Sequence, residues 1–160
     1  MDLEEANVNT ELIFKTYENG YHDIEDEIEA ISKSPEEIME AIKAVVDKSP
    51  KFKEIMAIDK YQGKKRILIK GNIYNSMLKR VLFVYLTPFN ANITQIRCIT
   101  KDSQRSTPPG QARNLIKETL KELGMEEKAK EFSKGSHKKE AKSLGKGVIK
   151  ETFSILKKIF

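Results

Sequence analysis

The stretch RILIKGNIYNSMLKRVLFVYLTPFNANITQIRCITK, residues 66–101, decides the fold class of this chain. Its first and last parts alternate apolar and polar side chains, which is the period of a strand with one buried face. Between them, residues 79–88 are apolar on both faces, as is typical of a central strand. Pro88 and the polar turn FNAN at 89–92 separate this strand from the next one. Such short connections predict an antiparallel meander.

Two helices are predicted upstream of the meander. The first covers residues 22–32, HDIEDEIEAIS, because its isoleucines recur at the i, i+4, i+7 spacing of one helical face and most other residues are acidic. The second covers residues 34–50, SPEEIMEAIKAVVDKSP, in which Ser34 is a favourable N-cap and Pro35 suits the first helical position. A first strand is predicted after this helix, at residues 51–59.

A helix over residues 112–123 is predicted to close the domain, and Gly124 provides its C-terminal stop. Because Phe132 is the only large apolar residue in the next segment, that segment is predicted to be a basic linker or a solvated helix. The expected fold class is α+β: an antiparallel meander of three to four strands, covered on one face by helices and followed by a C-terminal amphipathic helix. The predicted division of the chain is a polar segment 1–20, an α+β domain 21–124, a basic linker or solvated helix 125–143 and an amphipathic helix 144–160.

The order of elements between residues 35 and 123 resembles that of a small, functionally uncharacterised domain family. Two stretches carry the resemblance: SPEEIMEAIKAVVDKSPKFKEI at 34–55, and TQIRCITKDSQRSTPPGQARNLIKETLKEL at 94–123. In the second stretch, a strand ends in an arginine-containing loop that leads into a helix with an early arginine, Arg113. The resemblance implies a helix, a strand meander and a closing helix in a helix-grip-like arrangement, and it implies no particular chemistry.

The sequence contains no recognisable catalytic or metal-binding pattern. Cys98 is the only cysteine, and its position on the apolar side of a predicted strand favours a packing role. His22 and His137 have no neighbour at a metal-ligand spacing, and the glycine motifs of nucleotide-binding loops are missing. We therefore expect no catalytic residue, no metal, no cofactor and no small-molecule substrate, and we predict that the protein is not an enzyme.

The expected location is cytoplasmic, with peripheral attachment to a membrane as an option. A single cysteine is typical of a reducing compartment. The acidic N-terminus does not resemble a secretory signal. The longest apolar run, VLFVYL at 81–86, is far shorter than the roughly 20 residues that span a bilayer.

Charge is distributed unevenly along the chain. Residues 1–48 contain 14 Asp and Glu against 4 Lys, whereas residues 49–160 contain 25 Lys and Arg against 10 Asp and Glu. Two interpretations are open at this point. The basic part offers a surface to nucleic acid or anionic lipid, or it packs beside the acidic part and is neutralised by it.

The last segment, LGKGVIKETFSILKKIF at 144–160, predicts a helix with a wide apolar half and lysines opposite. This pattern is typical of a helix that lies on a membrane surface, binds a partner groove or docks on its own domain. The favoured function is a non-enzymatic binding or adaptor protein, which recruits a protein partner or an anionic membrane surface through this helix. The predicted binding residues are three lysines and four apolar anchors: Lys150, Phe153, Leu156, Lys157, Lys158, Ile159 and Phe160.

The alternative prediction is a nucleic-acid-binding protein that uses basic residues on the sheet together with the lysine-rich C-terminal region. Such residues would contact phosphates if the polar faces of the strands were aligned. Two of the arginines flank the start of the closing helix, where backbone N–H groups attract anions. The predicted nucleic-acid or anion-binding residues are Lys64, Lys65, Arg66, Lys70, Arg80, Arg97, Arg105 and Arg113.

Overall fold

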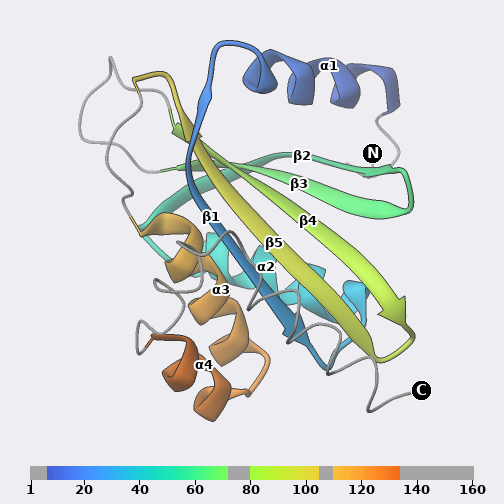
Figure 1. The fold of residues 1–160 in the computed structure, drawn as a ribbon, viewed down its shortest axis with the longest axis vertical. Helices are drawn as coiled ribbons and strands as arrows, with labels where there is room; N and C mark the ends of the chain where they lie inside the picture. Colours follow the sequence, from blue (N-terminus) through green and yellow to red (C-terminus); the bar gives the residue numbers. More distant parts are fainter. Residues whose placement is uncertain (1–6, 72–79, 105–109, 134–160) are drawn as a thin grey trace.

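The structure is a computed structural model, and it describes residues 7–71, 80–104 and 110–133. Four helices and five strands are formed in these ranges (Figure 1). In chain order they are α1 (Asn7–Glu18), β1 (His22–Ile31), α2 (Pro35–Lys48), β2 (Phe52–Tyr61), β3 (Lys64–Gly71), β4 (Arg80–Asn90), β5 (Ile93–Asp102), α3 (Gln111–Glu122) and α4 (Glu126–Ser133).

The five strands form one antiparallel sheet in the order β1-β5-β4-β3-β2. The four strands β2 to β5 follow one another as the predicted meander, and β1 pairs with the last of them. The α+β class and the antiparallel sheet are therefore confirmed, with five strands instead of three to four. The first strand lies beside the last, and the closing helix α3 packs on the sheet, which is a helix-grip-like arrangement (Figure 1).

The sheet separates two apolar cores. The larger core packs side chains of α2, α3 and α4 against one sheet face, with Ile67, Leu82 and Ile96 among its fully buried members. The smaller core lies on the opposite face, where Phe14 of α1 packs edge-on against Phe83 with ring centroids 5.7 Å apart. Helices therefore cover both faces, and not one face as expected (Figure 1).

Residues 22–31 form the edge strand β1, so the helix predicted over 22–32 is wrong. The isoleucine spacing fits a helical face, but strand pairing with β5 gives the segment a complete ladder along one side. The acidic side chains alternate to both faces of the sheet, where they meet cations of later elements. On one face Asp26 pairs with Arg97 at 2.6 Å, and on the other Glu27 approaches Arg113 at 3.6 Å. The interpretation in which the acidic part neutralises the basic part is confirmed at these positions.

α2 begins as the sequence predicts. Ser34 caps the helix by accepting a hydrogen bond from the Glu37 backbone N–H, and the Glu37 carboxylate in turn accepts one from the Ser34 N–H, which completes a capping box. Its buried stripe includes Ile38 and Ile42. Because this stripe packs on the core, the opposite face of the first turns of α2 is exposed, and it forms one side of the candidate site.

The segment after Gly124 is less solvated than predicted. α4 packs against α3, and it buries Ala129 and Phe132 in the larger core. The Nζ of Lys128 also donates a hydrogen bond to the carbonyl oxygen of Ala30 at 2.6 Å, which holds α4 close to the end of β1. The C-terminal amphipathic helix predicted at 144–160 lies outside the described residues, and the predicted domain boundaries stay predictions.

Cys98 is fully buried in the larger core, as its sequence position indicates. Burial, and next the negative charges of Glu25, Asp26 and Glu27, raise the pKa of its thiol well above the ordinary value. Because the thiolate is the reactive form, we expect no reaction with a disulfide reagent such as DTNB at pH 8 in the folded protein. One thiol should react once the protein is unfolded in guanidinium chloride. Rapid release of thionitrobenzoate from the native protein would contradict this burial.

Candidate functional site

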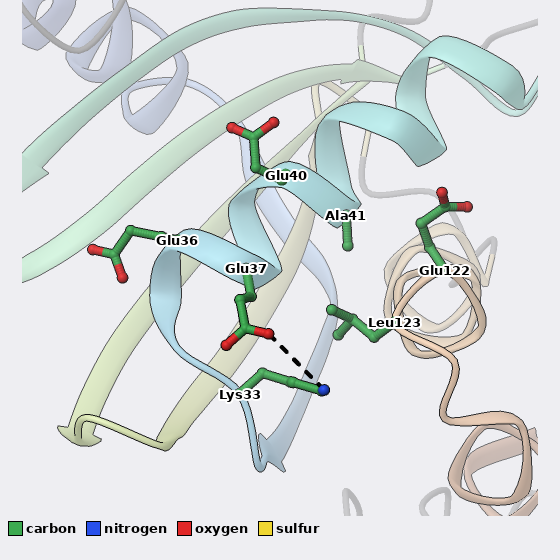
Figure 2. A pocket seen from close by; sticks show the side chains of 7 residues that line it. All are labelled: Lys33, Glu36, Glu37, Glu40, Ala41, Glu122 and Leu123. Carbon is green, nitrogen blue, oxygen red and sulfur yellow. Dashed lines mark ion pairs between the residues drawn. The ribbon is translucent and has the colours of Figure 1, made fainter.

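A hollow of about 570 Å³ lies between α2 and the C-terminal end of α3. We call it the α2–α3 groove. Figure 2 shows the side chains that line it: they come from α2, from Lys33 just before α2 and from the end of α3, and Glu36 and Glu40 point outward from α2. The lining residues are Lys33, Glu36, Glu37, Glu40, Ala41, Glu122 and Leu123.

The groove exists because two segments about 80 positions apart in the sequence are packed side by side. α2 contributes the side chains that its capped first turns leave outside the core. Leu123 is the C-cap residue of α3, and the left-handed Gly124 turns the chain away immediately after it. Ala41 and the partly buried Leu123 face the space between the helices and form an apolar floor (Figure 2).

The rim of the groove is mostly acidic. Its four glutamates are exposed, and Lys33 is the cation that lines the groove. Within the described part of the chain, Glu36 has no ion pair, and Glu37 meets Lys33 at 3.9 Å. The remaining two glutamates pair with exposed lysines outside the lining, Glu40 with Lys43 at 3.4 Å and Glu122 with Lys48 at 3.0 Å. The rim is thus a set of solvated carboxylates, and two of them pair with exposed surface lysines.

The carboxylates of the groove are not arranged as a metal centre. Over residues 7–71, 80–104 and 110–133, no group of three or more His, Cys, Asp or Glu side chains is placed to hold a metal ion. The chemistry that the groove supports is therefore recognition: an apolar floor for hydrocarbon and a rim of acceptors for cationic donors.

The sequence did not single out any residue of this groove. Glu36, Glu37 and Glu40 have the composition of an ordinary solvated helix face, and Glu122 is one of many charges near the end of α3. These residues come together only because α2 packs on α3, and no local sequence pattern predicts that packing. The buried stripe of α2 indicates which face of the helix is exposed, but it does not indicate that α3 packs beside that face.

The arginines predicted to bind nucleic acid are divided between the two sheet faces. Arg66 and Arg97 lie on the α1 side, in one cross-strand row with Asp59 and Tyr85. By strand alternation, Arg80 lies on the opposite side, next to Asp102 of β5 at 3.7 Å. On that same side one N–H group in the first turn of α3 already has a partner, because Glu25 accepts a hydrogen bond from the Ala112 N–H at 2.9 Å.

Arg66 is the most enclosed of these arginines. Its guanidinium makes two hydrogen bonds to Asp59, at 2.9 and 2.6 Å, and it lies between the rings of Phe14 and Tyr61 at 4.1 and 4.4 Å from their centroids. Burial lowers the pKa of Arg66, but the hydrogen bonds and charge of Asp59, followed by the charge of Glu18, raise it above its ordinary value. This arginine joins α1 to the sheet and is not presented to a ligand.

Tyr85 and Arg97 continue the same row toward the open part of the sheet. Burial, and then the charge of Glu18, raise the pKa of Tyr85, so this side chain is a neutral phenol at ordinary pH. The hydrogen bond from Arg97 to Asp26 raises the pKa of that guanidinium. Each cation in the row is thus matched by a carboxylate of the same protein.

The remaining predicted binding residues are placed as follows. Lys64 and Lys70 are exposed on β3, and Lys65 beside them is half-buried. Arg105 and the C-terminal set Lys150, Phe153, Leu156, Lys157, Lys158, Ile159 and Phe160 lie outside the described residues. The binding roles of these individual residues stay predictions.

Comparison with known proteins gives matches to solved structures only. No family model matches the chain, and no curated protein matches its sequence. A START superfamily protein from Mycobacterium smegmatis is 13% identical, with a TM-score of 0.33, over 70% of this chain and 100% of its own. The Zhui aromatase/cyclase from Streptomyces sp. R1128 is 10% identical, with a TM-score of 0.28, over 72% of this chain and 95% of its own. Neither match carries an activity or a ligand over to this chain.

The predicted function, an adaptor with nucleic-acid binding as its alternative, is corrected by these findings. The matched structures are described as a START superfamily protein and an aromatase/cyclase, so no match supports an adaptor or a nucleic-acid-binding protein. In addition, Arg66, Arg80, Arg97 and Arg113 pair with carboxylates on two different sheet faces instead of forming one basic surface. In the part of the chain that the structure describes, no helix is long and apolar enough to cross a bilayer.

Proposed function

We propose that this protein binds a ligand that has an apolar body and a cationic group, and that the α2–α3 groove is its binding site. The observation that supports the proposal is the combination of a hollow of about 570 Å³, an apolar floor and a carboxylate rim in one place. The hollow is largely open to solvent, so a ligand would lie along the surface between the two helices. The proposal concerns recognition and assigns no reaction.

The floor supports the apolar part of such a ligand. Ala41 presents a methyl group from α2, and Leu123 presents its side chain from α3 on the opposite side (Figure 2). A hydrocarbon chain placed between them removes apolar surface from water on both helices and on the ligand, and each buried methylene contributes about 0.8 kcal/mol. Specificity for a hydrocarbon ligand would come from this floor and not from the rim.

The rim supports the cationic part. Glu36 is unpaired within the described residues, Lys33 beside Glu37 is half-buried, and the lysine partners of Glu40 and Glu122 are exposed. Exposed ion pairs contribute about 0–1 kcal/mol, so a ligand ammonium displaces these lysines at small cost. An anionic ligand of equal length meets four carboxylates and only Lys33 as a lining cation, and it is therefore disfavoured.

The test is titration of the full-length protein with three probes of equal chain length: decylamine, decanol and decanoate, each below its micelle concentration. We expect decylamine to bind most tightly and decanoate least tightly. The backbone amide signals of Ala41 and Leu123 should shift in a two-dimensional NMR spectrum. Equal binding of all three probes, or shifts confined to other parts of the protein, would overturn the proposal.

Matched variants localise the site. Replacing Glu36 and Glu40 together by Gln removes two rim charges, and the expected loss of about 1 kcal/mol weakens decylamine binding roughly fivefold. Decanol binding should not change, because decanol carries no charge. The control is Glu54→Gln, which removes an exposed carboxylate on β2 outside the groove. This control should leave all three affinities unchanged.

A further inference from the structure

We propose that the ligand of the α2–α3 groove carries a cationic group at each end of an apolar chain, as a linear aliphatic diamine does. This inference rests on the proposed function, because it uses the same groove and the same kind of contact, an ammonium group on a carboxylate. It adds a second recognition point, since carboxylates line the groove from both α2 and α3, with Ala41 and Leu123 between the helices.

Glu37 provides the recognition point near the start of α2. One oxygen of its carboxylate accepts a hydrogen bond from the Ser34 N–H at 3.3 Å, and this capping box fixes the orientation of the side chain. The second oxygen meets the Nζ of Lys33 at 3.9 Å, as the dashed line in Figure 2 shows. A primary ammonium group of the protein itself therefore already lies beside this carboxylate.

Glu122 provides the recognition point on α3. Its carboxylate meets the Nζ of Lys48 at 3.0 Å. Lys48 is the last residue of α2, whereas Glu37 lies in its first turn, so this second contact lies toward the opposite end of the helix. Each of the two carboxylates thus holds one lysine ammonium group, and these two groups mark where the ends of a dication can lie.

The spacing of the two contacts sets the length of the ligand. Lys48 follows Glu37 by 11 positions, which corresponds to about 16.5 Å along the helix axis. The two carboxylates are closer together than this, because the side chain of Lys48 leans toward the N-terminus of its own helix. They are farther apart than the single turn of about 6 Å from Glu37 to Ala41, since Ala41 lies between Glu37 and Glu122 (Figure 2). Three bonds of an extended chain span about 3.8 Å, so the nine bonds between the nitrogens of 1,8-diaminooctane span about 11 Å, which falls within this interval.

Two linked contacts give selectivity over a monoamine. Lysine ammonium groups compete for both carboxylates, but the exposed fraction of the side chain is 35% for Lys33 and 68% for Lys48. Ion pairs with such exposed partners are weak, so a ligand ammonium can replace them. Once one end of a diamine is bound, its other end stays near the second carboxylate at a high effective concentration. A monoamine makes only one of the two contacts.

The test compares diamines with monoamines of the same carbon number, by NMR titration of the full-length protein at low salt. The amide signals of Ala41 and Leu123 report binding in the groove. The dissociation constant of octylamine divided by that of 1,8-diaminooctane isolates the effect of the second ammonium group. We expect this ratio to be about fivefold larger than the same ratio for propylamine and 1,3-diaminopropane, whose nitrogens are only about 5 Å apart and cannot reach both carboxylates. Equal ratios for the two lengths would show general charge attraction alone and would overturn the proposal.

Matched variants assign the two ends. Glu37→Gln and Glu122→Gln should each remove the advantage of 1,8-diaminooctane over octylamine, and glutamine at position 37 still completes the capping box. The control is Glu118→Gln, one turn earlier on α3. The side chain of Glu118 is 32% exposed where that of Glu122 is 33% exposed, and it meets Lys51 at 4.0 Å, but it does not line the groove. The control should keep the advantage, and an equal loss in Glu118→Gln would contradict the assignment.

Removing the competing lysines provides an independent measurement. Lys33→Met combined with Lys48→Met should strengthen the binding of 1,8-diaminooctane about fivefold, because the ligand then has no lysine ammonium to replace. Unchanged or weaker binding would show that the ligand does not take these two positions, and the proposal would fail. The proposal also fails if a short peptide with two lysines binds more tightly than the diamine, or if the groove signals shift with protein concentration alone, as they would if a second copy occupied the groove.

Failure of this inference and failure of the proposed function give different results. If decylamine binds in the groove more tightly than decanol, but the second ammonium of 1,8-diaminooctane adds nothing, the proposed function stands and the two-ended site is overturned. If the diamine binds through both Glu37 and Glu122, but decylamine binds no more tightly than decanol, the two-ended site stands and the proposed function fails. If no amine shifts the groove signals, both fail.

Discussion

Replacing Arg66 by Met should lower the free energy of unfolding by about 3–5 kcal/mol. The substitution keeps most of the side-chain volume but leaves the Asp59 carboxylate buried without its partner. It also removes the cation that lies between the rings of Phe14 and Tyr61. Because a buried unpaired carboxylate cannot recover its hydration, the whole desolvation cost remains. Urea unfolding followed by circular dichroism at neutral pH measures the loss.

The protein provides a matched control for this experiment. Arg97 makes the same two hydrogen bonds to Asp26, at 3.0 and 2.6 Å, but its side chain is 47% exposed where that of Arg66 is 5% exposed. Arg97→Met should therefore cost no more than about 1 kcal/mol. Equal losses in the two variants would show that burial does not decide the effect.

A double variant separates the two possible causes. If the unpaired carboxylate causes the loss, then Arg66→Met combined with Asp59→Leu should recover most of the stability, because an apolar pair can replace a buried ion pair at little cost. If the loss persists in the double variant, the contacts of the guanidinium with the two rings are the larger contribution.

Replacing Phe132 by Ala should lower the free energy of unfolding by about 3–5 kcal/mol, which is the usual cost of truncating a buried aromatic ring. Phe132 is 1% exposed and belongs to the larger core, where α4 packs against α3. Truncation leaves a cavity beneath a helix of only two turns, and it removes the main apolar contact of that helix. The measurement is again the urea unfolding midpoint and slope.

The control for Phe132 is an apolar residue that is not buried. Leu12 on α1 is 58% exposed, and Leu12→Ala should change the stability by no more than about 0.5 kcal/mol. A similarly small effect of Phe132→Ala would mean that α4 is a solvated helix after all, as the composition of residues 125–143 indicates. A smaller unfolding slope in the variant would show that α4 detaches in a separate step.

The strands β2 to β5 and the helices α2 and α3 could be predicted because their signals are local. The alternation of apolar and polar residues in β3 and β5 indicates which side chains face each core. The apolar run in β4 indicates that both faces of that strand are covered. The helix cap at Ser34 and the helix stop at Gly124 are likewise recognisable from neighbouring residues in the sequence. None of these features needs a distant partner to be recognised.

The strand β1 was mispredicted as a helix, and the buried positions of α4 were not predicted, because their environment comes from elsewhere in the chain. The acidic residues of β1 look solvated in isolation, but they meet cations of β5, α3 and α4. In α4, a single aromatic residue among lysines and glutamates gives no hint of a core position. The α2–α3 groove escaped prediction for the same reason, since strands β2 to β5 separate its two sides in the sequence.

The sequence by itself determined the class of this protein: an antiparallel meander, the helix that precedes it and the helix that closes it. These follow from side-chain periodicity and capping, which act over a few residues. The tertiary structure alone decided that residues 22–31 join the sheet as its edge strand, that both sheet faces are covered, and that four of the predicted binding arginines pair with carboxylates of the same chain. It also decided where the groove lies. Pairing of strands, ion pairs and helix packing depend on residues brought together by the folded chain, and a linear pattern does not contain that information.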